Sequence, residues 1–105
     1  MELAGKKLGL MVSTGPEHAN LDAALGLGEA AMNRGADVYL YLIDDAVRAV
    51  EEARVQRLAG RGLRLFVCAY GCQKRGLPLS DKATNCGLVV LTDVLNGTDR
   101  FVALN

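Results

Sequence analysis

Two spacings of apolar residues alternate along the chain. Short apolar runs that close in glycine or small polar residues are typical of buried strands, whereas apolar residues repeated every three or four positions indicate a helix with one buried face. Strands and helices are therefore expected to alternate. The patterns predict strands over 7–15, 36–43, 63–69 and 99–105, and helices over 20–35, 46–60, 70–76 (one short turn) and 85–97.

Residues at the ends of the predicted helices support this division. Gly35 is suited to end the first helix in the left-handed conformation. Asp44 and Asp45 offer the second helix an N-cap and negative charge in its first turn. Asn85 offers an N-cap to the last helix and Gly97 a stop, although the run GLVVLT within it is also typical of a strand. We favour the helix there.

Strands that alternate with helices predict a parallel sheet covered on both faces, because each right-handed crossover carries a helix. We expect a single three-layer α/β/α domain over residues 1–105, with a mainly parallel, flavodoxin-like sheet of four to five strands. Ligands bind such sheets beyond the carboxyl ends of the strands. The segments 13–18 (STGPEH), 44–45 (DD) and 68–72 (CAYGC) each follow a predicted strand, so we expect them to meet there.

The composition fits an ordinary globular domain. Half of the 105 residues are apolar, and the formal net charge is zero. Residues 1–50 carry four Lys or Arg against seven Asp or Glu, and residues 51–105 carry eight against five. Four arginines between Arg54 and Arg64 hold much of the positive excess, and their spacing indicates a solvated helix face rather than a site for an acidic partner. Neutrality and few aromatic residues give no indication of nucleic-acid binding.

Targeting signals and membrane spans are not evident. No apolar run approaches the ~20 residues needed to span a bilayer. The stretch LGLMV near the N-terminus is too short for the apolar region of a signal peptide and is followed by a turn. Three cysteines, an odd number, do not suggest a secreted disulfide framework. We expect a cytoplasmic protein without membrane contacts, whose thiols are free at rest.

The three cysteines carry the candidate chemistry, and three interpretations of them are open. Free cysteines are commonly small apolar core residues, and Cys86, next to the apolar GLVVL, fits this interpretation best. A metal site would need about four ligands, and His18 with the three cysteines reaches that number, but without the spacing of paired zinc ligands. The third interpretation is a reactive thiol that needs neither a metal nor an organic cofactor.

Cys68 is the strongest candidate for a reactive thiol. It lies where a strand ends and a helical turn begins, so unpaired backbone N–H groups, together with Lys74 and Arg75, favour its thiolate form. Cys72 lies on the same face of such a turn, with Cβ atoms ~5 to 6 Å apart. A disulfide prefers ~3.5 to 4.5 Å, so pairing would require the turn to open. Cys72 is therefore either an occasional second thiol or a packing residue.

The same segments resemble the DsrE/TusD-like sulfur-relay family. The resemblance rests on VCA at the end of a strand, a small-residue turn, KRGL, the opening TGP and the closing GTDRFVAL, and it extends over most of the chain. It implies a small α/β protein in which a cysteine ahead of an Arg-Gly pair carries sulfur as a persulfide. Matching back from Arg75 and Gly76 puts Cys68 at that position, whereas Cys72 falls where relatives typically have a small residue.

The resemblance implies a sulfurtransferase-like carrier that accepts sulfur from a donor protein and passes it to an acceptor protein. It also implies a homo-oligomer, for which uncovered edge strands are a physical reason. Gly71 either keeps the turn open for a partner or fits a tight turn, and His18 is either a base near the thiol or an exposed loop residue. The candidate substrate-binding residues are Gly15, His18, Tyr70, Gly71, Lys74 and Arg75.

The alternative function is a non-catalytic, flavodoxin-like binding module that uses the 13–18 loop for a small anion or nucleotide. The first turn lacks both the G-x-G-x-x-G fingerprint and a phosphate-loop Gly-Lys-Ser/Thr, which weighs against a nucleotide.

Overall fold

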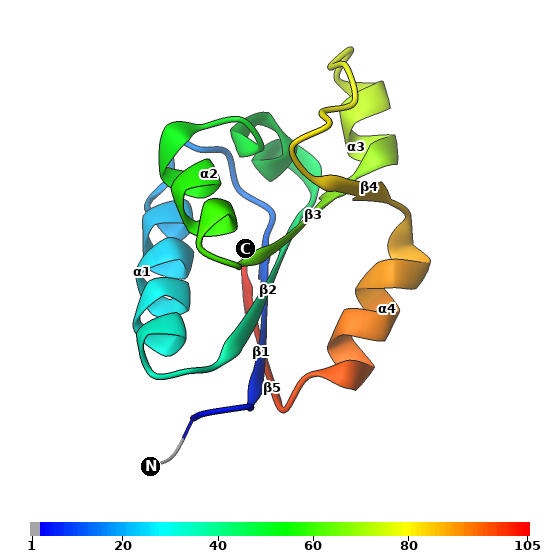
Figure 1. Ribbon diagram of the computed structural model, residues 1–105. Coiled ribbons are helices and arrows are strands. Elements are labelled where there is room, and N and C mark those ends of the chain that lie inside the picture. Colours follow the sequence, from blue (N-terminus) through cyan, green and yellow to red (C-terminus); the bar gives the residue numbers. More distant parts are fainter. Residues whose placement is uncertain (1–2) are drawn as a thin grey trace.

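A five-stranded sheet, parallel throughout, organises the chain, which the computed structural model describes over residues 3–105 (Figure 1). The strand order is β4-β3-β2-β1-β5, so the chain moves outward from β1 to β4 and then returns to the other side of β1. The elements are β1 (Lys7–Val12), α1 (Ala19–Asn33), β2 (Asp37–Leu42), the 3₁₀ helix η1 (Asp44–Ala49), α2 (Ala53–Gly60), β3 (Arg64–Cys68), α3 (Ala69–Lys74), β4 (Thr84–Cys86), α4 (Leu88–Gly97) and β5 (Arg100–Leu104).

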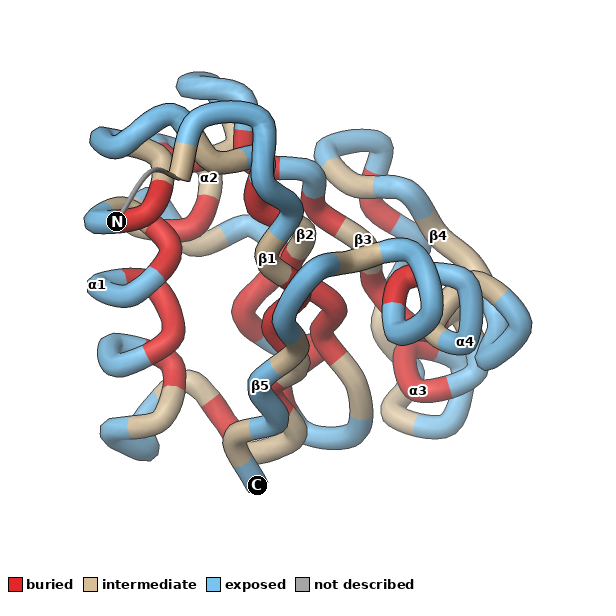
Figure 2. Tube along the Cα trace, turned by 90° about the horizontal axis from the view of Figure 1, so that it is seen from below, coloured by how far each residue is buried: buried red, intermediate tan, exposed pale blue. Residues whose placement is uncertain are grey.

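Helices α1 and α2 cover one face of the sheet, and α4 lies against the other (Figure 1). The core lies mainly on the α1 side, where Leu10 of β1, Leu40 of β2 and Val67 of β3 are fully buried beneath Leu21 and Leu58. Seen from below, α1 turns its buried residues toward the sheet and its exposed residues outward (Figure 2). The predicted α/β fold with a parallel sheet and helices on both faces is confirmed.

The predicted helix over 46–60 is wrong as a single element. The chain forms η1 first and begins α2 only at Ala53, after Glu52 adopts an extended backbone as the N-cap. Ala46, Val47, Ala49 and Val50 are all buried. Four apolar residues within five positions do not fit on one face of an α-helix, and the tighter 3₁₀ turn followed by a break buries all of them.

The predicted role of Asn85 as a helix N-cap is also wrong. Residues 84–86 form β4, which pairs with β3, and Gly87 is the N-cap of α4. The Asn85 side-chain amide instead donates hydrogen bonds to the carbonyl oxygens of Ser80 (2.7 Å) and Ala83 (3.3 Å). Pairing with the otherwise open edge of β3 outweighs the local capping preference.

The charge asymmetry between the two halves of the chain is compensated within the molecule. Arg54 of α2 pairs with Asp22 of α1, and Arg57 and Arg61 pair with Glu29 of α1 at 2.9 and 2.8 Å. These pairs are partly exposed and screened by solvent, so each contributes little to stability. Arg57, Arg61 and Arg64 are exposed, as predicted for a solvated face, and pairing with α1 accompanies that exposure rather than replacing it.

Within residues 3–105, no helix combines the length and the apolar character that crossing a membrane requires.

Gly26, within α1, and Gly35, just after it, differ in the space available for a larger side chain. Gly35 has a φ of +88°, as predicted, and an added Cβ would lie 3.2 Å from the Ala4 Cα, whereas nothing lies within 4 Å of a Cβ on the exposed Gly26. We expect Gly35→Ala to lower the free energy of unfolding by about 1 to 2 kcal/mol. Gly26→Ala should raise it by about 0.5 to 1 kcal/mol, because alanine favours the helix. Urea denaturation measures both, and shifts of the same sign would contradict the difference expected between the two positions.

Candidate functional site

Cys68 lies at the junction between β3 and α3. It is the last residue of the strand and the N-cap of the helix, and the Gly71 N–H donates a hydrogen bond to its Sγ at 3.4 Å. A sulfur atom thus accepts a hydrogen bond from an amide group that the start of a helix leaves without a backbone partner. The residue is only 4% exposed, so the thiol is enclosed rather than openly accessible as a simple relay would require.

Gly71 allows α3 to lie directly against η1. A Cβ at this position would lie 3.1 Å from Cγ1 of Val47 and 3.6 Å from the Cβ of Cys68. The helix would have to move outward to accommodate a larger residue. Of the two sequence interpretations of Gly71, the geometry favours a fit to tight packing.

Arg75 joins the end of α3 to η1. Its Nη1 donates a hydrogen bond to the Gly71 carbonyl oxygen at 3.2 Å, and its Nη2 lies 2.9 Å from Oδ1 of Asp45. The guanidinium charge is therefore partly compensated, although it still acts to lower the pKa of the Cys72 thiol against the larger effect of burial. Lys74 and Tyr70 are exposed on the outer side of α3.

The 13–18 loop reaches η1 from the other direction. Glu17 pairs with Arg48 at 2.8 Å, and this contact holds the pKa of the Glu17 carboxyl below its usual value. A Cβ on the buried Gly15 would collide with Nη2 of Arg48, so the end of this side chain lies directly beside the loop. The loops after β1, β2 and β3 therefore meet at one edge through η1, as the sequence predicted.

His18 is the N-cap of α1, and its Nδ1 accepts a hydrogen bond from the Asn20 N–H at 3.0 Å. It is exposed, and this contact lies within its own helix. Its role as a base near the thiol stays a prediction. The binding-module alternative likewise stays a prediction.

Cys72 lies inside the core, with 1% of its surface exposed. Burial raises the pKa of its thiol, and the neighbouring Cys68 acts in the same direction. A role as a second thiol would require α3 to open, so for Cys72 this role stays a prediction.

Tyr41 and Cys86 belong to the same site, and sequence reasoning missed both. Cys86 of β4 is the register partner of Cys68 of β3, so the two side chains lie on the same face of the sheet. Tyr41 is fully buried on this face, and its hydroxyl donates a hydrogen bond to the Gly87 carbonyl oxygen at 3.0 Å. Burial raises the Tyr41 pKa, and the charges of the nearby Cys86 and Cys68 thiols act in the same direction.

Only weak features of the sequence point to Tyr41 and Cys86 as site residues. Cys86 precedes an apolar run that we assigned to one helix, and only pairing with β3 turns residues 84–86 into a strand. The hydroxyl of Tyr41 in a buried strand does imply a polar partner, because buried hydroxyl groups are rarely left without one. The expectation that Cys86 is apolar filler is therefore incomplete, since its Sγ lies 3.7 Å from the Val67 carbonyl oxygen and the Tyr41 hydroxyl lowers the pKa of its thiol against the larger, raising effect of burial.

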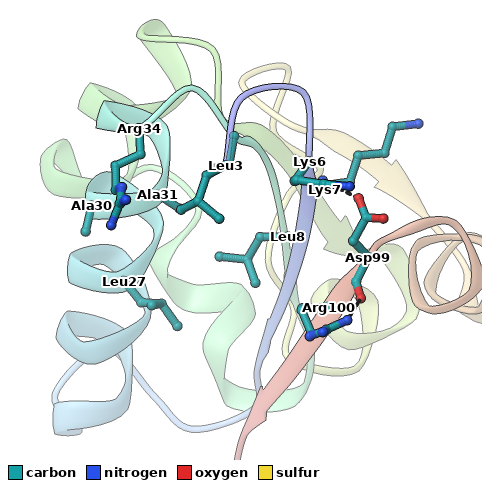
Figure 3. Close-up of a pocket in the computed structure, with 11 residues that line it drawn as sticks. Leu3, Lys6, Lys7, Leu8, Leu27, Ala30, Ala31, Arg34, Asp99 and Arg100 are labelled. Carbon is teal, nitrogen blue, oxygen red and sulfur yellow. Dashed lines mark hydrogen bonds between the residues drawn. The ribbon is translucent and has the colours of Figure 1, made fainter. Parts of the chain in front are cut away.

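A cavity of about 580 Å³ lies at the opposite end of the strands from the cysteines. Leu8, Leu27 and Ala31 supply apolar walls, and Arg34 and Arg100 lie at its margin (Figure 3). A second cavity of about 280 Å³ lies between α4 and the stacked rings of Tyr39 and Phe66. Neither is lined by a cysteine, so chemistry rather than cavity size identifies the candidate site. Among residues 3–105, no three or more His, Cys, Asp or Glu side chains gather to hold a metal ion.

Comparisons with known proteins agree with the fold. The family model described as the DsrE/DsrF-like family matches residues 6–104. The crystal structure of the ychN protein from E. coli is similar, with a TM-score of 0.78 and 22% sequence identity over 95% of this chain and 99% of that one. At this identity the similarity concerns the fold. No curated protein matches the chain in sequence.

The raised pKa of the Cys72 thiol makes stability depend on pH. The unfolded chain loses this proton above about pH 8.5 while the folded chain retains it, so the free energy of unfolding falls as the pH rises. We expect urea denaturation in the presence of a reductant to give a lower value at about pH 9.5 than at about pH 7.5. Cys72→Ala should be less stable at both values but show a smaller difference between them. An unchanged difference would contradict the assignment to Cys72.

Proposed function

The chain belongs to the DsrE/DsrF-like family, and on this basis we propose that it carries sulfur as a persulfide on Cys68. The observation that carries the proposal is the position of Cys68 at the carboxyl end of β3, with its Sγ accepting a hydrogen bond from the Gly71 N–H. This amide is oriented to stabilise negative charge on sulfur.

The chemistry is an exchange between thiols. The Cys68 thiolate attacks the outer sulfur of a donor persulfide, the donor leaves as a thiolate, and Cys68 then holds the outer sulfur. Attack by an acceptor thiolate on that sulfur returns Cys68 to its thiolate form. Each step breaks one S–S bond and forms another, so no external oxidant, metal or organic cofactor is required. The partners are a sulfur donor protein and an acceptor protein, in a reducing compartment such as the cytoplasm.

Burial of Cys68 implies that a partner must approach closely or displace part of α3. Tyr70, 68% exposed, and Lys74 form the outer surface of this helix, where a partner would make contact. Gly71 and Arg75 support this surface from within, because Arg75 donates a hydrogen bond to the Gly71 carbonyl oxygen and pairs with Asp45 of η1. Gly15 and His18 frame the neighbouring loop.

A homo-oligomer is supported by α4 rather than by the strands. The apolar run 38–43 is mostly buried, whereas Leu88, Val89 and Leu95 of α4 are exposed. Of the residues of α4, only Val94 is buried. An apolar helix face of this kind is typical of a surface that another subunit covers.

The sulfur-carrier function can be tested by mapping persulfides. After incubation of the reduced protein with cysteine persulfide, alkylation and peptide mass spectrometry should find one added sulfur atom on the peptide of Cys68. Cys68→Ser should abolish labelling at that position. Lys82→Gln, a change in an exposed residue of the loop before β4, serves as a control and should label as the wild type does. A wild-type protein with an unmodified Cys68 would contradict the proposal.

The oligomer can be tested at Val89, which is 76% exposed. A buried, unpaired lysine would disfavour association, so Val89→Lys should reduce the mass that light scattering measures during size-exclusion chromatography. Ala23→Lys, on the exposed side of α1, is the matched control and should leave the mass unchanged. A wild-type monomer, or an unchanged mass for Val89→Lys, would contradict this assembly.

A further inference from the structure

Cys86 is the thiol that lies beside Cys68 in the sheet. We propose that Cys86 is a second sulfur carrier, which takes the outer sulfur from the Cys68 persulfide and presents it to the acceptor. This inference rests on the proposed function of Cys68 and assigns the next step at the same site. Four observations support it: the strand register, the difference in burial, the contacts of both sulfur atoms and the enclosure of Cys72.

The register brings the two thiols together. Cys68 and Cys86 are paired residues of adjacent parallel strands, which lie ~4.8 Å apart, with both side chains on the same face. A direct disulfide prefers a Cβ–Cβ distance of ~3.8 Å, so it would strain the paired strands. The outer sulfur of a persulfide lies ~2 Å beyond Sγ, which extends the reach of Cys68 toward Cys86. The geometry therefore favours transfer of the outer sulfur over closure of a disulfide.

The difference in burial gives the transfer a direction. Cys68 is enclosed, whereas Cys86 is only half-buried, on the short edge strand β4. A sulfur atom held on Cys68 is shielded from solvent thiols, and one held on Cys86 is closer to the surface. An acceptor thiol can then reach the sulfur without entering the β3–α3 junction.

The surroundings of the two sulfur atoms suit their roles in the transfer, with Cys86 as the attacking group and Cys68 as the leaving group. The Cys86 thiolate attacks the outer sulfur of the Cys68 persulfide, a new S–S bond forms on Cys86, and the electron pair of the broken bond remains on Cys68 as a thiolate. The Gly71 N–H hydrogen bond stabilises that leaving thiolate. Burial raises the pKa of the Cys86 thiol, and the neighbouring Tyr41 hydroxyl, which donates to the Gly87 carbonyl oxygen, acts against that rise. Tyr41 is accordingly a positioning residue.

Cys72 does not offer the same route. It is buried, as Cys68 is, and the helix that carries it contacts η1 through Arg75 and through the close packing of Gly71. Sulfur on Cys72 would be no closer to an acceptor.

The test is a load-and-release experiment with cysteine persulfide as donor and glutathione as acceptor. In the wild type, peptide mapping should find the added sulfur first on Cys68 and then on Cys86. Cys86→Ser should load Cys68 normally but release sulfur to glutathione about tenfold more slowly. Cys86→Ala provides a second variant, and thermal unfolding establishes which variants are folded. Thr84→Ser, an exposed position of β4 two residues earlier, is the matched control and should release sulfur at the wild-type rate.

Tyr41→Phe separates positioning from packing, since it keeps the buried ring and removes the hydroxyl. It should load Cys68 normally and lower the ratio of sulfur on Cys86 to sulfur on Cys68. A structural role alone would not change this ratio in a folded variant.

The outcomes distinguish the carrier role of Cys68 from that of Cys86. If Cys68 in the wild type acquires no sulfur, the proposed function fails. If Cys68 loads, but Cys86 never carries sulfur and the folded Cys86 variants release it at the wild-type rate, the role of Cys86 alone is overturned. Slow release from Cys72→Ser combined with normal release from Cys86→Ser would also overturn it, in favour of Cys72.

Discussion

Parallel pairing of β3 between β2 and β4 is the constraint on which the candidate site depends. Pairing with β4 puts Cys86 beside Cys68. Pairing with β2 puts Tyr41 on the same face of the sheet as these two cysteines. Because paired strands keep a fixed spacing, the pairing itself holds these side chains near one another, and the cysteines are free. The paired part of β3 ends at the carboxyl edge of the sheet, where α3 begins. Sulfur chemistry at this site would therefore depend on the integrity of a three-residue edge strand.

The 3₁₀ helix η1 links the elements around this edge. Its apolar residues are buried in the core, while Arg48 reaches the 13–18 loop and Asp45 reaches Arg75 beyond α3. These ion pairs are partly exposed and contribute little to stability, but they connect the loops that follow β1, β2 and β3. Gly71 completes the arrangement by allowing α3 to approach η1 closely.

Enclosure of Cys68 fits a carrier that protects its cargo. Free thiols in a reducing compartment would remove an exposed outer sulfur rapidly, because exchange rates depend on access. In the proposed relay, a buried first thiol with a less buried neighbour would separate storage from delivery. The exposed apolar face of α4 lies next to this region, since α4 begins just after Cys86. Assembly through α4 would thus influence access to the same sulfur atoms.

The amino-acid pattern by itself determined the alternating strands and helices, the parallel sheet, the left-handed turn at Gly35 and the position of Cys68 at a strand end. These follow from local periodicity and backbone preference, which act within a few residues. Local pattern did not predict the break before α2, the strand β4 or the pairing of Cys86 with Cys68. Burial of the η1 residues and pairing with the edge of β3 decided these features, because they depend on what lies alongside a segment after folding. The tertiary structure therefore changed the candidate site from a pair of cysteines in one turn into a pair on adjacent strands.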